Sequence, residues 1–191
     1  MDPDRALGVV VVMGVSGAGK STIGRALARR RRAEFVEGDL LHPPENVARM
    51  RAGLPLDDDA REPWLDAIAR VIADHCRSGD PAVIACSALR RRYRERLRTA
   101  GPVRFVLLDV SAGVLLGRVT DRAHEFMPAS LLDDQLATLE PPADDEVDVV
   151  VVGTRPNPAD TVADVERALD DMETWPEPAD APGSDPSDSA P

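Results

Sequence analysis

Residues 14–21, Gly-Val-Ser-Gly-Ala-Gly-Lys-Ser, constrain the fold of this chain more than any other segment. The apolar, largely β-branched run at 9–13 predicts a buried strand before them, and residues 20–32 predict a helix after them. A strand, a glycine loop and a helix in this order fit the pattern G-x-x-x-x-G-K-[ST]. In that pattern, backbone N–H groups and the positive end of the helix surround a phosphate chain. The alternative is an ordinary glycine turn capped by Ser21.

The lysine in this loop, Lys20, is the only lysine of the chain, and the other 22 basic residues are arginines. Arginine in place of lysine nearly everywhere indicates a coding bias, so the exception is informative. A compact ammonium can reach back over the loop to the β- and γ-phosphates, whereas a guanidinium is wider and forked. Ser21 can place its hydroxyl on Mg²⁺. The sequence therefore predicts that ATP binds at Gly14, Val15, Ser16, Gly17, Ala18, Gly19, Lys20, Ser21 and Thr22.

Strand and helix patterns alternate along the chain, which predicts an α/β fold with a parallel sheet covered on both faces. Further strands are expected at 34–36, 82–86, 103–110 and 147–152. Further helices are expected at 45–51, 61–77, 89–100, 112–122, 128–139 and 158–172. We expect one domain over residues 1–173. Residues 174–191, rich in proline and acids and without a basic residue, are expected to be a disordered tail.

Charge and composition argue against several kinds of partner. The net charge of −11 repels nucleic acid. The longest apolar stretch, residues 6–15, is too short to span a bilayer. Two cysteines without metal-binding spacing favour a reduced, cytoplasmic protein.

The residues after the expected strands favour a kinase of small molecules among the phosphate-loop proteins. Proteins that recognise guanine need a second lysine in their base-binding motif, and this chain has only one. ATPase motors usually have acidic residues at the end of the third strand. In this chain that strand ends with residues 85–88, Ala-Cys-Ser-Ala, which include no acid. Glu37 and Asp39 follow the second strand, at the sheet edge where ligands bind. One carboxylate can orient the acceptor hydroxyl, and Glu37 can hold a Mg²⁺-bound water. A capped loop with surface acids is the alternative.

Residues 37–65 and 85–98 resemble the signatures of the bacterial gluconokinases, and the resemblance covers roughly residues 8–170, including 126–140. It implies ATP-dependent transfer of phosphate to the 6-hydroxyl of D-gluconate, giving 6-phospho-D-gluconate. It also implies a three-layer P-loop kinase fold with a five-stranded parallel sheet, a small mobile lid at about 118–130, and a homodimer.

The resemblance implies roles for residues that match the family's motifs. The catalytic residues would be Lys20, Asp39 and Arg122, with Asp39 deprotonating the acceptor hydroxyl. Arg118 and Arg122 would be the lid arginines that clamp the ATP phosphates. The substrate would be contacted by Asp39, His42, Arg49, Arg61, Ser87, Ala88, Arg90, Tyr93 and Arg94. For the arginines, a solvated helix face is the alternative.

Two positions depart from the family pattern. Ala60 stands where the family usually has aspartate, and Glu125 stands at a usual histidine, with His124 one residue early. Two other functions therefore stay open. One is a shikimate-kinase-like or other sugar-acid kinase, and the other is a nucleotide-binding regulator that has lost turnover.

Overall fold

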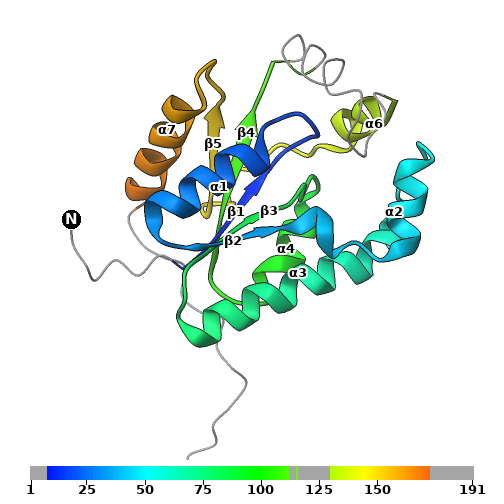
Figure 1. The fold of residues 1–191 in the computed structure, drawn as a ribbon, viewed down its shortest axis with the longest axis horizontal. Helices are drawn as coiled ribbons and strands as arrows, with labels where there is room; N and C mark the ends of the chain where they lie inside the picture. The colour runs from blue at the N-terminus through cyan, green and yellow to red at the C-terminus, as the bar shows by residue number, and fades with distance from the viewer. Residues whose placement is uncertain (1–7, 112–114, 116–129, 173–191) are drawn as a thin grey trace, which may run out of the picture.

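The computed structural model describes residues 8–111, 115 and 130–172. Its centre is a sheet of five parallel strands in the order β2-β3-β1-β4-β5 (Figure 1). The strands are β1 (Val9–Met13), β2 (Glu34–Glu37), β3 (Ala82–Ala85), β4 (Val103–Asp109) and β5 (Val149–Gly153). The predicted α/β class and the five-stranded parallel sheet are confirmed.

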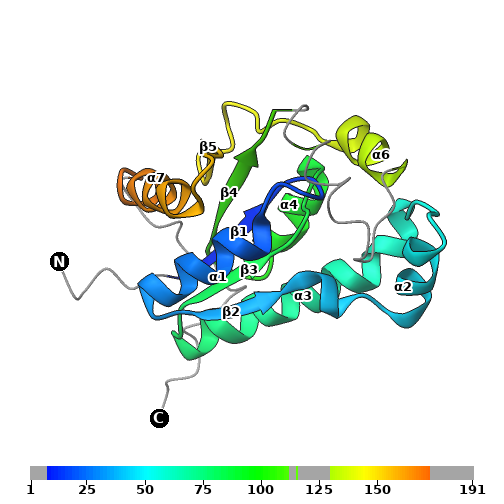
Figure 2. The same cartoon turned by 45° about the horizontal axis from the view of Figure 1, so that its top comes forward.

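Helices cover both faces of the sheet (Figure 2). Along β1, Val10 and Val12 face one core and Val9 and Val11 the other, because successive side chains of a strand point to opposite faces. The first core is closed by α1 (Lys20–Arg31) and α7 (Pro158–Asp170), and the second by α3 (Asp58–Ser78) and α4 (Arg91–Arg98).

Two further helices, α2 (Pro44–Arg51) and α6 (Ser130–Thr138), lie together at one end of the molecule, opposite α7 (Figure 1, Figure 2). A short 3₁₀ helix, η1 (Gly38–Leu41), connects β2 to α2. No helix within the described residues is both long enough and apolar enough to cross a membrane.

Several element ends differ from the sequence-based prediction. The helix expected at 61–77 begins at Asp58, because Asp57 caps it: the Ala60 N–H donates to Asp57 Oδ1 at 2.9 Å. The helix expected at 89–100 is shorter, Arg91–Arg98, and η1 was not expected at all. Most of the helix predicted at 112–122, the lid and the tail lie outside the described residues.

Candidate active site

The loop between β1 and α1 has a backbone that favours glycine at three positions. Gly14, Gly17 and Gly19 have φ angles of 136°, 79° and 97°, a region that side chains with a Cβ rarely adopt. At Gly14 a Cβ would also lie 3.2 Å from the Leu108 carbonyl oxygen. Side-chain-free backbone is what allows this loop to approach a phosphate chain closely.

Lys20 begins α1 and its side chain folds back over the loop, where its Nζ donates to the Val15 carbonyl oxygen at 3.0 Å. No acidic residue lies in the first turn of α1, so nothing there opposes the positive end of the helix. Ser21, in the same turn, is half-buried. These features fit the phosphate chain of a nucleotide.

The described residues contain no group of three or more His, Cys, Asp or Glu side chains that could hold a metal ion. Mg²⁺ bound with ATP needs only one or two protein oxygens, since phosphates and water complete its shell. The Ser21 hydroxyl suits that role. Glu37 has another neighbour: its carboxylate lies 3.5 Å from Arg25 Nη2, a contact that the sequence analysis did not foresee.

Asp39 is placed by the glycine before it. A Cβ on Gly38 would lie 2.3 Å from the Ala85 carbonyl oxygen, so this backbone passes β3 too closely for any side chain. The Gly38 carbonyl oxygen accepts a hydrogen bond of 2.8 Å from the indole of Trp64, which is fully buried on α3. Gly38 is thus held between β3 and α3, and Asp39 follows it into a cleft that Lys20 also lines.

His42 packs flat on Trp64, with ring centroids 4.3 Å apart and planes 10° from parallel. Its Nδ1 lies 3.4 Å from the Asn46 amide nitrogen, which can only donate, so in neutral His42 the proton is on Nε2. Burial lowers the pKa of His42 from 6.5 to about 4. The negative charge of Asp39 opposes this shift by raising the pKa, and the positive charge of Arg61 lowers it further. His42 is therefore a neutral N–H donor at pH 7.

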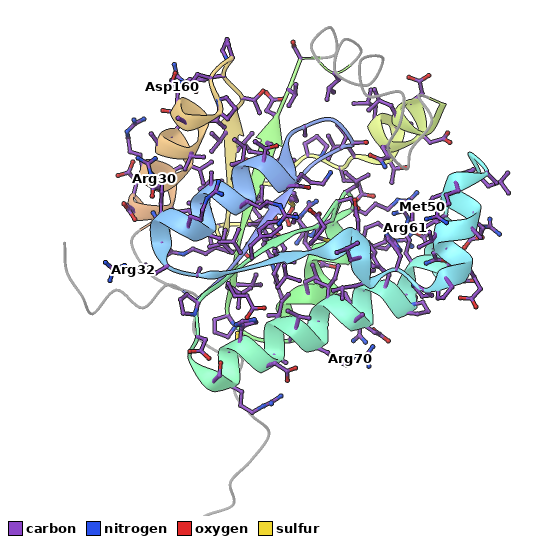
Figure 3. The ribbon with its side chains drawn as sticks, in the orientation of Figure 1. Arg30, Arg32, Met50, Arg61, Arg70 and Asp160 are labelled. Carbon is purple, nitrogen blue, oxygen red and sulfur yellow. The ribbon has the colours of Figure 1, made fainter. Side chains whose placement is uncertain are left out.

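The cleft has an empty volume of about 650 Å³, including the part open to solvent. Arg61 reaches it from α3 and is held by a hydrogen bond of 3.2 Å from its Nε to the Leu56 carbonyl oxygen. Burial lowers the pKa of Arg61. Figure 3 shows Arg61 and Met50 near each other beside α2, and both line the cleft. The predicted site residues that line the cleft are Ser16, Lys20, Asp39, His42, Arg61 and Ser87.

Other predicted substrate residues lie elsewhere. Arg49 is exposed and donates to the Pro55 carbonyl oxygen at 3.2 Å. Arg90, at 3.2 Å, and the Tyr93 hydroxyl both bind the Asp58 carboxylate at the start of α3. These contacts hold α4 to α3, and the structure does not bring the three side chains to the cleft.

Arg94 was expected to contact the substrate, but its side chain is fully buried and its Nε and Nη2 bind Glu146 at 2.7 and 2.6 Å. Its place in the fold is that of a structural ion pair. Ala88 is also buried, with an unusual φ of 39° just after Ser87. Arg118 and Arg122 lie outside the described residues.

One wall of the cleft was not predicted from the sequence. Asp134, Gln135 and Thr138 of α6 line it, and the Ser16 backbone N–H donates to Gln135 Oε1 at 2.6 Å. The available signal was the spacing i, i+1, i+4 of polar residues on one helical face. Four further lining residues are apolar, namely Met50, Leu54, Pro55 and Leu56.

A glycine phosphate loop on the first strand of a five-stranded parallel sheet, facing a cleft lined by carboxylate, imidazole and guanidinium groups, defines a P-loop kinase. A family model described as an AAA domain matches residues 9–142. The gluconokinase of Gluconobacter oxydans (strain 621H) is 50% identical over 147 residues, which are 76% of this chain and 83% of that protein. The chain belongs to the gluconokinase family, as its sequence motifs indicated.

Two solved structures agree with this assignment. A sugar kinase from Janibacter sp. HTCC2649 has a TM-score of 0.81 and 44% identity, covering 86% of this chain and 95% of that one. A gluconokinase from Sinorhizobium meliloti 1021 has a TM-score of 0.75 and 43% identity, covering 89% and 99%. The likeness extends over nearly the whole of both chains.

Proposed function

We propose that this protein is an ATP-dependent gluconokinase that phosphorylates the 6-hydroxyl of D-gluconate and releases 6-phospho-D-gluconate. Membership of the gluconokinase family carries the proposal. The cleft supports it, because the ammonium of Lys20 and the carboxylate of Asp39 line the same space. One group suits the phosphates of a donor, and the other suits the hydroxyl of an acceptor.

The residues of the cleft have distinct tasks in this proposal. Asp39 accepts the proton of the 6-hydroxyl while the oxygen forms its bond to the γ-phosphorus and the bond to the departing ADP breaks. Lys20 stabilises the negative charge that develops on the phosphate oxygens. Arg61 attracts the carboxylate of gluconate, and His42 donates from Nε2 to one of its oxygens. ATP with Mg²⁺ supplies the phosphoryl group and neutralises part of its charge.

The Ala60 departure leaves the local contacts intact. The Ala60 carbonyl oxygen accepts from Asn46 Nδ2 at 2.6 Å, and its N–H donates to Asp57, so position 60 acts here through its backbone. This supports a working enzyme rather than a regulator without turnover. His124 and Glu125 lie outside the described residues.

The proposal extends to the organisation of the protein. We infer one kinase domain over residues 1–173, with a lid at about 118–130 that carries Arg118 and Arg122, and a tail at 174–191. A cytoplasmic location is inferred from the free cysteines Cys76 and Cys86, and a homodimer from family resemblance alone.

A coupled ADP-release assay over a panel of sugar acids, with shikimate included, tests the activity. We expect D-gluconate to be the preferred acceptor. Asp39→Asn keeps the shape but cannot take the proton, so kcat should fall by roughly 10²–10⁴-fold. ATP affinity and melting temperature should change little, because the phosphate loop is intact.

Asp59→Asn is the matched control, because Asp59 is exposed and precedes Arg61 without lining the cleft. It should keep the kcat of the wild type. Preferred turnover of shikimate or another acid would replace gluconate as substrate, and ATP binding without ADP release would identify a regulator. If Asp39→Asn loses melting temperature and keeps its kcat, Asp39 is a structural acid.

A further inference from the structure

The α6 wall of the cleft is bonded directly to the phosphate loop. The hydrogen bond from the Ser16 N–H to Gln135 Oε1, 2.6 Å long, joins residues that are 119 positions apart in the sequence. A backbone N–H can only donate, so the side-chain oxygen of Gln135 must face Ser16, and the orientation of its amide is fixed. Both residues also line the cleft. Gln135 therefore bonds to the phosphate loop and lines the same cleft as Asp39.

The chain just after α6 is anchored as well. The Glu140 N–H donates to the Leu89 carbonyl oxygen at 2.8 Å, and Glu140 Oε2 accepts from the Arg91 N–H at 2.7 Å. Arg94 Nη1 adds a bond of 3.2 Å to the Glu140 carbonyl oxygen. The chain leaving α6 is thus attached to the segment after β3.

The segment after β3 is itself connected to the phosphate loop. The Ser87 carbonyl oxygen accepts from the Gly14 N–H at 3.2 Å, and Ser87 lines the cleft. The helix α6 is therefore attached to two loops, through Gln135 in its second half and through Glu140 just after its end. The contact of Gln135 with Ser16 sets how far the cleft face of α6 stands from Lys20. Phosphoryl transfer is sensitive to that spacing, since a displacement of about 1 Å can cost roughly 10²-fold in rate.

We propose that Gln135 is a positioning residue that couples the phosphate loop to the acceptor side of the cleft and so sets the alignment of the two substrates. This inference rests on the proposed function. The proposed role of Gln135 is kinetic, although its side chain neither accepts the proton of the 6-hydroxyl, as Asp39 does, nor carries a positive charge, as Lys20 does. Its effect passes through the Ser16 backbone and the α6 wall.

Two substitutions test whether the hydrogen bond from the Ser16 N–H matters, or only the presence of a side chain at position 135. Gln135→Leu removes the oxygen, and kcat with ATP and gluconate should fall by about 10–100-fold. Gln135→Glu keeps an oxygen that can accept from the Ser16 N–H but adds a negative charge. It should recover most of kcat, while the KM values for both anionic substrates rise.

Amide hydrogen exchange gives a readout that does not depend on turnover. The peptide containing Ser16 should exchange faster in Gln135→Leu than in the wild type, and Gln135→Glu should restore its protection. Asp133→Asn is the matched control, because Asp133 is exposed on the same helix and does not line the cleft. It should leave the exchange and both kinetic constants unchanged.

The outcomes distinguish this inference from the proposed function. If the wild type does not phosphorylate gluconate, the proposed function fails, whatever the exchange shows. If the wild type is active and Gln135→Leu keeps its kcat, or loses only melting temperature, the coupling role is wrong. Equal loss of kcat in Gln135→Leu and Gln135→Glu would also overturn it, because the retained oxygen would then have no effect.

Discussion

The buried ion pair between Arg94 and Glu146 makes Arg94→Met a sharp test of what holds α4 in place. The Arg94 side chain is fully buried and that of Glu146 is 2% exposed. Methionine fills much of the arginine's volume but removes two hydrogen bonds to Glu146, of 2.7 and 2.6 Å, and the 3.2 Å bond to the Glu140 carbonyl oxygen. Glu146 then keeps one cationic partner, Arg98, at 2.8 Å. The substitution therefore leaves a buried carboxylate with less compensation.

The size of the effect follows from the acidity of Glu146. Hydrogen bonds from Arg94, more than those from Arg98, lower the pKa of Glu146 from 4.5 to about 2, although burial opposes the shift. Because the folded state binds this proton less tightly, the stabilisation is complete above pH 4.5 and is lost as the pH falls from 4.5 to 2. At about 1.4 kcal/mol per pKa unit, the whole shift corresponds to about 3 kcal/mol, an upper bound for the Arg94 part because Arg98 and the Ala143 N–H also contribute to the shift.

Removing one partner of a buried pair typically costs about 3–5 kcal/mol, which agrees with that figure. For a domain of this size, about 3 kcal/mol lowers the melting temperature by about 10 °C. Urea unfolding at pH 7 measures the free energy of unfolding directly. We expect Arg94→Met to lose about 3 kcal/mol at pH 7 and less as the pH approaches 2, because wild-type stability falls there.

Two comparisons make the result interpretable. Arg96→Met, on the same helix, breaks an exposed pair with Asp66 and should cost at most about 1 kcal/mol. Adding Glu146→Gln to Arg94→Met removes the uncompensated charge and should recover part of the loss. A loss below about 1 kcal/mol in Arg94→Met, or a pH dependence equal to that of the wild type, would refute this account.

Two other substitutions test single geometric features. Lys20→Arg conserves charge but not shape, so ADP release with gluconate should collapse while the melting temperature holds; near-normal turnover would refute the shape argument. Gly38→Ala has no room for its Cβ, which would lie 2.3 Å from the Ala85 carbonyl oxygen, and should lose at least about 2 kcal/mol of unfolding free energy. Gly153→Ala, where nothing lies within 4 Å, is its control and should be near neutral; equal stability of the two variants would contradict the reasoning.

The strands could be predicted from sequence to within a residue or two at each end, because buried parallel strands are continuous apolar runs between polar turns. The 3₁₀ helix η1 could not, since Gly-Asp-Leu-Leu has no periodic pattern. Its path depends on the approach of Gly38 to the Ala85 carbonyl oxygen and on the bond from Trp64. Those contacts appear only once β2, β3 and α3 are assembled.

Within the site, residues placed by local sequence patterns were predicted, and residues placed by tertiary contacts were not. Lys20, Asp39 and Ser87 follow parallel strands, whose carboxyl ends meet at one edge of the sheet, so sequence position alone predicts that they converge. All three line the cleft. Gln135 follows no strand, and its contact with Ser16 depends on how α6 returns to the loop. Helical spacing could have suggested its face but not its partner.

The arginines show where residue type stops being informative. With a single lysine in the chain, arginine fills nearly every cationic role, so the run 90–98 does not reveal which side chains are buried. The position in the helix does reveal it. Arg94 lies on the same face of α4 as Tyr93 and Leu97, both of which are buried. This spacing predicts that the Arg94 side chain faces the core and needs an acidic partner there. Lys20 is the reverse case. Its type carries the information, because a compact ammonium can fold back over the glycine loop, where the wider guanidinium of arginine is expected not to fit.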